Sequence, residues 1–188
     1  MSELPMVIVA NIGDLGVEQS YPNIVIEQAN GNINPPSFFN QIYEKHPVKQ
    51  NSPNQQLYLF LPKEFRCVDK FTIQKMVDVL SYNDNFTGVY SDMYLCGKTK
   101  NITYVPAYDK KIIDTNIIVN TPIMFSGSCR PIFHDKIKHL HFYQVLTTVG
   151  QRFIFCHVAE PLFSATYKIS LPHKEIKEDM EIISSLKS

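Results

Sequence analysis

The stretch that decides the fold begins with the apolar run Leu57-Tyr58-Leu59-Phe60-Leu61, which Pro62-Lys63-Glu64 interrupts. A short apolar run bounded by a proline is typical of a buried strand. Residues 71–80 then carry apolar side chains three, four and seven positions apart, which is the period of an α-helix. A second strand-like run, residues 87–91, ends at Asp92. The pattern predicts a βαβ unit, and in such units ligands usually bind at the loop after the first strand. The apolar face of the predicted helix consists of Ile73, Met76, Val77 and Leu80.

The same alternation of apolar runs and helical segments extends over the rest of the chain. The predicted strands are residues 6–10, 24–26 and 153–158, and residues 93–105 form a predicted hairpin. The predicted helices are residues 38–44, capped by Ser37, and a C-terminal amphipathic helix at about 173–187. Strands that alternate with helices predict one α/β domain spanning residues 1–188. We expect a sandwich with a central, mainly parallel sheet flanked by helices.

Composition and charge exclude several classes of function. The 188 residues include 18 basic and 18 acidic side chains, so the net charge gives no support for binding nucleic acid. The longest apolar runs have about five residues, against the roughly 20 of a membrane-spanning helix. Residues 1–5 lack the basic and apolar regions of a signal peptide, so we expect a protein of the cytoplasm or of a particle assembled there. The four cysteines include no CxxC pair, so no zinc site is predicted.

Several segments resemble, in order, those of glycosyltransferase family 2, whose members transfer sugar from nucleotide sugars. The run Gln19-Ser20-Tyr21-Pro22-Asn23 before Ile24-Val25-Ile26 is similar to the family's Gln-Thr-Tyr-x-Asn before its second strand. Residues 57–61 resemble the strand that leads into a metal-binding Asp-x-Asp. The resemblance covers residues 6–168 and implies a GT-A fold, which is a Rossmann-like α/β sandwich. Further similar segments are residues 71–80, 88–92, 121–133 and 155–162.

The metal-binding motif that the resemblance implies is absent from this chain. In the family, two aspartates hold a divalent cation on the diphosphate of the donor, because the leaving group gains negative charge. The matching positions here read Pro62-Lys63-Glu64, in which Glu64 is the one acidic remnant. Lys63 either neutralises a diphosphate directly or is a solvated loop lysine. We therefore expect no resident cofactor, and Mn²⁺ or Mg²⁺ at Glu64 only if a nucleotide sugar still binds there.

The carboxylate base of the family is missing as well. The stretch that matches its position, His139-Leu140-His141-Phe142-Tyr143-Gln144, contains no carboxylate. His141 is the candidate base, because imidazole titrates near neutral pH, and a packing or surface role is the alternative.

Four positions resemble family residues that contact the nucleotide. For Asn11, Glu27 and Asn30, the alternative role is that of a polar loop or turn. For Asp92, the alternative is that it simply ends a strand. These positions are Asn11, Glu27, Asn30 and Asp92.

Two main functions stay open on this reading. The chain is either a glycosyltransferase-like protein that acts on a nucleotide sugar and is impaired in catalysis, or a non-catalytic subunit of a larger assembly, such as a virus particle. A lesser alternative is one half of an enzyme that a partner chain completes. All of them predict protein partners or a homo-oligomer, and we expect no metal-dependent sugar transfer by the chain alone. Any remaining nucleotide pocket is expected at the carboxyl ends of the first, second and central strands.

Overall fold

The computed structural model describes residues 4–29, 35–48, 55–96, 100–105, 121–127 and 154–166. The predicted helix at about 173–187 lies outside these residues. The first elements are β1 (Met6–Asn11), β2 (Ile24–Gln28), α1 (Pro35–Lys45), β3 (Gln56–Leu61) and β4 (Phe65–Cys67). They are followed by α2 (Thr72–Tyr82), β5 (Gly88–Cys96), β6 (Lys100–Thr103), β7 (Met124–Ser126) and β8 (Phe155–Thr166).

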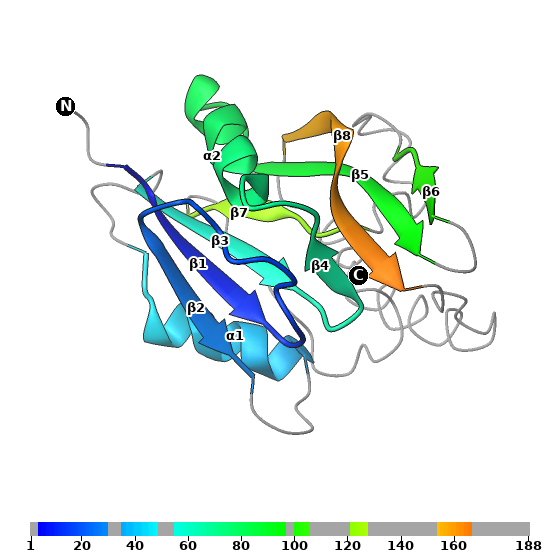
Figure 1. The fold of residues 1–188 in the computed structure, drawn as a ribbon. Coiled ribbons are helices and arrows are strands. Elements are labelled where there is room, and N and C mark those ends of the chain that lie inside the picture. The colour runs from blue at the N-terminus through cyan, green and yellow to red at the C-terminus, as the bar shows by residue number, and fades with distance from the viewer. Residues whose placement is uncertain are drawn as a thin grey trace, which may run out of the picture.

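The described strands form one mixed sheet (Figure 1). Its order is β2-β1-β3-β7-β5-β8-β4, and β6 pairs with β5 outside this path. The ladders β1–β2, β1–β3 and β5–β8 are parallel. The ladders β3–β7, β5–β7, β5–β6 and β4–β8 are antiparallel.

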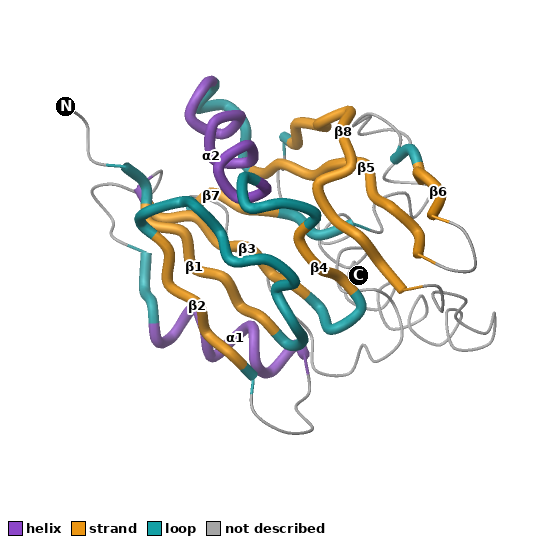
Figure 2. The backbone as a smooth tube through the Cα atoms, viewed as in Figure 1, coloured by secondary structure: helices purple, strands orange, loops and turns teal. Residues whose placement is uncertain are grey.

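The short turn between β3 and β4 requires the sheet to curl. In a flat sheet these two strands would lie four strand spacings apart, or roughly 19 Å. The chain from Leu61 to Phe65 spans at most about 14 Å when fully extended. The β4 edge must therefore bend back toward β3, which gives the sheet the shape of a half-barrel (Figures 1 and 2).

Each face of the sheet carries one apolar cluster and one of the two described helices. All six residues of β3 are buried, as expected for a strand covered on both faces. Tyr58 and Phe60 face α1 and pack with Phe39, whose ring centroid lies 4.7 Å from that of Phe60. Leu59 and the other odd-numbered β3 residues face α2. The α2 side of this second cluster consists of Ile73, Met76, Val77 and Leu80.

The structure confirms several of the predicted elements but corrects their assembly. Strands at Val7, Val25, Leu59 and Val89 and the helix after β4 are confirmed. The predicted GT-A-like, Rossmann-like sandwich with a mainly parallel, helix-flanked sheet is wrong, because the described chain forms a curled, β-rich sheet with four antiparallel ladders. Local periodicity reports which residues are buried but not the direction in which strands pair. The direction changes because the three-residue strand β7 enters antiparallel between β3 and β5.

Candidate functional site

The carboxyl ends of β1 and β2 carry a closed set of polar contacts. Asn11 is 2% exposed, and its Nδ2 donates to Gln28 Oε1 at 2.9 Å. Asn11 Oδ1 accepts a hydrogen bond from Gly13 N at 3.3 Å, and Gln28 Nε2 donates to Gly13 O at 2.9 Å. Asn11, a predicted nucleotide contact, therefore has both polar side-chain atoms engaged with its neighbours.

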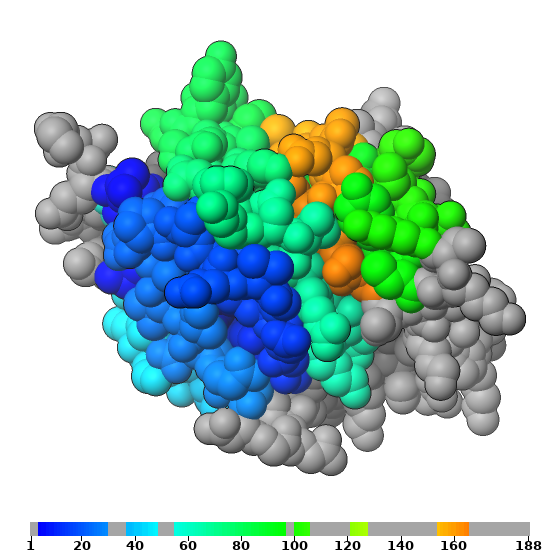
Figure 3. All heavy atoms as spheres, in the orientation of Figure 1, coloured from blue at the N-terminus to red at the C-terminus, as the bar shows by residue number. Residues whose placement is uncertain are grey.

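The turn after β3 packs directly against this set of contacts. A Cβ atom on Gly13 would lie 2.7 Å from Lys63 Cα and 2.9 Å from Lys63 O, so the two backbones are in close contact. Phe65 N donates to Pro62 O at 3.0 Å and closes the turn. Figure 3 shows atoms of the β1–β2 segment lying against those of the β3–β4 segment on this face. We call this region, built from Asn11, Gly13, Gln28 and residues 62–64, the strand-end edge.

Glu64, the predicted metal ligand, lies half-buried in the turn, while Lys63 is exposed and Pro62 is buried. Within the described ranges, no three His, Cys, Asp or Glu side chains are grouped so that they could hold a metal ion. Mn²⁺ and Mg²⁺ prefer several oxygen ligands, and Glu64 supplies only one carboxylate.

Glu27 points away from the strand-end edge and toward α1. Consecutive strand residues face opposite sides of a sheet, so Glu27 and Gln28 diverge. Glu27 Oε2 lies 2.7 Å from Lys45 Nζ, and its Oε1 lies 2.7 Å from His46 Nε2. The hydrogen bonds from Lys45 and then His46 lower the pKa of the Glu27 carboxyl. This predicted nucleotide contact instead fastens the end of α1 to β2.

Asp92, the remaining described candidate, lies deep between β5 and β8. Its side chain is 2% exposed, and Oδ1 accepts hydrogen bonds from Val105 N at 2.8 Å and His157 Nε2 at 2.9 Å. The His157 ring stacks on Tyr90, with the centroids 5.1 Å apart. The β5–β8 register shifts on both sides of Asp92, and such bulges often re-aim side chains at functional sites. The sequence assigned His157 only to the predicted strand of residues 153–158, and no spacing pattern linked it to Asp92.

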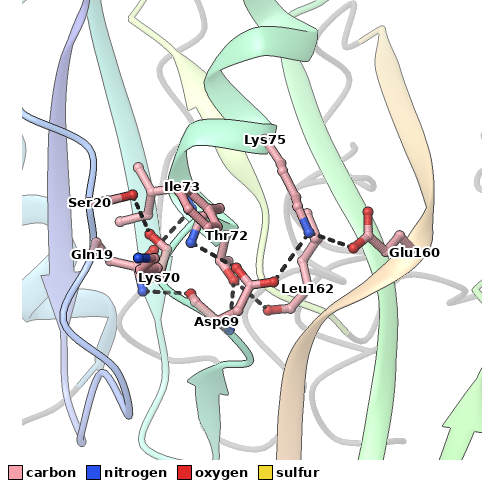
Figure 4. A network of polar contacts seen from close by, with 10 residues as sticks. Gln19, Ser20, Asp69, Lys70, Thr72, Ile73, Lys75, Glu160 and Leu162 are labelled. Atoms are coloured by element: carbon pink, nitrogen blue, oxygen red, sulfur yellow. Dashed lines mark hydrogen bonds and ion pairs between the residues drawn. The ribbon is translucent and has the colours of Figure 1, made fainter.

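A polar network at the start of α2 supports the fold (Figure 4). Lys75 Nζ lies 2.5 Å from Glu160 Oε1 on β8 and 3.2 Å from Asp69 Oδ2. The bond to Glu160, and then that to Asp69, raises the pKa of Lys75. Gln19 Oε1 accepts a hydrogen bond from Ile73 N at 3.1 Å and so caps the helix from the β1–β2 segment. The charges and N–H groups of this network are paired within the chain.

The predicted site residues do not converge on one place. Asn11 and Glu64 belong to the strand-end edge, Glu27 faces α1, and Asp92 lies between β5 and β8. Asn30 and the candidate base His141 lie outside the described residues, as does His139.

No protein-family model matches the chain, and the search of curated proteins found no match either. Within the described part of the chain, neither helix is long and apolar enough to span a membrane.

Proposed function

We propose that this chain is a non-catalytic binding or assembly module, related to nucleotide-sugar transferases, that acts through contacts with other protein chains. The observation that carries the proposal is the closed strand-end edge. The side-chain polar atoms of Asn11 and Gln28 form hydrogen bonds with each other and with the backbone of Gly13. These atoms lie at the carboxyl ends of parallel strands, where an α/β enzyme keeps its polar groups for a ligand.

The charge at the turn also favours a non-catalytic role. Departure of a nucleoside diphosphate places negative charge on its oxygen atoms, and a metal-dependent transferase meets that charge with a cation held by oxygen ligands. Here the first position of the turn is a buried proline and the second an exposed lysine, which repels a cation. Glu64 alone is too small a donor set for Mn²⁺ or Mg²⁺.

The direct test is detection of free nucleoside diphosphate after incubation of the purified chain with Mn²⁺ and a panel of nucleotide sugars. We expect release at the background rate and no shift of Tm with any member of the panel. A bound ligand at about 100 times its Kd would add roughly 2.7 kcal/mol to the free energy of unfolding, which is enough to detect. Turnover that Glu64→Ala abolishes, and that the exposed control Glu18→Ala retains, would overturn the proposal.

A double substitution tests whether the missing cation site alone accounts for the expected lack of transferase activity. Pro62→Asp with Lys63→Ser rebuilds two oxygen donors beside Glu64. Mn²⁺ binding by this variant, measured by calorimetry, would support descent from a metal-dependent transferase. Mn²⁺ binding by the unaltered chain at this turn would contradict the proposal.

A further inference from the structure

We propose that the open edge of β2 is an interaction surface, and that its partner is β2 of a second copy of this chain, paired antiparallel. The inference deepens the proposed assembly role, on which it rests for its meaning, by naming the surface and the partner. Two copies joined in this way form one continuous sheet across a two-fold axis.

β2 is the open end of the sheet. Among the described strands it pairs only with β1, whereas β4 at the opposite end is covered, because Cys67 N donates to Leu15 O at 2.9 Å (Figure 1). Edge strands usually carry a free charge, a proline or a bulge that prevents pairing with another chain. Residues 24–28 include no proline and keep an unbroken register with β1. The one charged side chain of β2, Glu27, is held by Lys45 on the α1 side, so nothing in the strand blocks its edge.

The backbone of β2 presents unpaired groups at alternate residues. Val7 N donates to Asn23 O and Ala29 N donates to Asn11 O, both at 2.9 Å, so the odd-numbered residues of this segment bond to β1. The N–H and C=O groups of the even-numbered residues therefore point to the open edge. Within the described chain no hydrogen bond reaches these groups. They belong to Ile24, Ile26 and Gln28.

These open groups are complementary to themselves under a two-fold axis. In an antiparallel pair, hydrogen-bonded residues face each other at every second position. With the axis at Ile26, this residue faces Ile26 of the second copy, and Ile24 faces Gln28, so every open group of the strand has a partner. A shift by two residues in either direction would instead pair the strand with Pro22, which has no N–H, or with Asn30, and both lie outside β2. The strand thus fits a second copy best in one register.

The side chains agree with this register. Ile26 is 48% exposed, and pairing with its own copy removes apolar surface from water. Cross-strand pairs of β-branched residues stabilise a sheet, whereas like charges directly opposite each other destabilise it. Glu27 faces Val25 of the second copy, so no like charges are opposed. The net charge of the chain is zero, so no overall repulsion opposes association.

The length of the strand sets the expected affinity. Specific, stable interfaces bury about 1,200 Å² or more, and a pair of five-residue strands gives a smaller contact. We therefore expect a weak dimer, with a Kd on the order of 10 μM. The contact occupies the same edge in both copies, so association stops at two.

The first test measures the mass of the purified full chain by analytical ultracentrifugation between about 1 and 300 μM. We expect a reversible equilibrium between monomer and dimer. Ile26→Lys places two ammonium groups opposite each other and should weaken the dimer at least about tenfold. The side chain is exposed, so the variant should fold. Ile102→Lys on β6 is the matched control, because Ile102 is 43% exposed, and it should form dimers as the wild type does.

A second test reads the register without any variant. Amide hydrogen exchange, followed by NMR at increasing protein concentration, should slow at Ile24, Ile26 and Gln28, whose N–H groups gain partners in the dimer. Exchange at Val25 and Glu27 should not change, because their N–H groups already donate to β1. This pattern decides the question even if Ile26→Lys does not fold.

Three results would overturn the inference. The first is a chain that stays monomeric over the whole concentration range, and the second is a dimer that Ile26→Lys leaves intact. The third is slow exchange at the three open amides that does not depend on concentration, which would mean that the edge is covered within one chain. Nucleoside diphosphate release separates this inference from the proposed function. A monomer with background release leaves that function standing, and a dimer with Glu64-dependent turnover refutes that function alone.

Discussion

Gly13→Ala is expected to destabilise the protein by forcing the strand-end edge apart. The new Cβ atom would lie 2.7 Å from Lys63 Cα and 2.9 Å from Lys63 O, distances at which one backbone must move. Overpacking of this kind typically costs about 1–3 kcal/mol of the free energy of unfolding. At this chain length each kcal/mol lowers Tm by roughly 2–4 °C, so we expect a Tm lower by roughly 2–12 °C. Thermal unfolding followed by circular dichroism measures the shift, and urea unfolding gives the free energy.

Two controls separate the backbone contact from other causes. Glu18→Ala changes an exposed side chain of the same segment and should leave Tm unchanged. The double variant Gly13→Ala with Lys63→Ala should be no more stable than Gly13→Ala alone, because the nearest atoms belong to the Lys63 backbone. Wild-type stability of Gly13→Ala, or its rescue by Lys63→Ala, would refute the reasoning that the two segments are in backbone contact.

Three further predictions concern titratable groups. Glu27→Gln should cost at most about 1 kcal/mol at neutral pH, because the partner Lys45 is largely exposed. Folding lowers the Glu27 pKa below 4.5, so the difference in unfolding free energy between variant and wild type should vanish as pH falls through the pKa of the folded state. Urea titrations at several pH values measure this difference, and a difference that is constant with pH would contradict the prediction. Lys75→Met should cost a similar amount. Folding raises the Lys75 pKa above 10.5, so that cost should fade as pH rises through the folded value, and persistence there would exclude the ion pair as its cause. Burial raises the pKa of the Cys67 thiol to about 12, so in the folded chain iodoacetamide should alkylate Cys67 far more slowly than the half-buried Cys96. In urea the two cysteines should react at equal rates, and peptide mass spectrometry measures both rates. Equal rates in the folded chain would disprove the burial of Cys67.

The sequence predicts the elements of this fold better than their arrangement. The period of residues 71–80 identifies α2 and its buried face, and the unbroken apolar run of residues 57–61 identifies a strand covered on both sides. β8 shows where local reasoning stops. It runs through Pro161, which a sequence pattern treats as a break, because that proline lies at the register shift beside Asp92. Strand direction depends on long-range pairing, so no local pattern revealed the antiparallel entry of β7.

For the candidate site too, the sequence predicts where residues lie along the strands but not which residues they contact. Position along the sequence correctly suggested that Asn11 lies at the end of a strand, but not that Gln28 would occupy its polar atoms. The two-residue alternation of strands was the available signal, since it separates Glu27 from Gln28 and assigns only one of them to the edge with Asn11. The Asp92–His157 contact joins residues 65 positions apart, and no spacing rule connects residues so distant.

The turn at residues 62–64 links the fold to the proposed loss of catalysis. It must return the chain within three residues so that β4 can join β8, and its Pro62 carbonyl accepts the hydrogen bond that closes it. The same backbone packs on Gly13, which leaves no space for a Cβ atom, let alone a hydrated cation, at that contact. Residues 62–64, at which the proposed relationship would place a cation site, are thus committed in this chain to closing the curled sheet. An aspartate at the buried Pro62 position would place a carboxylate where solvent is excluded, so a metal-binding aspartate there would work against the packing of the turn. The packing that closes the strand-end edge thus also disfavours a metal-binding carboxylate at position 62, which supports the proposed non-catalytic role.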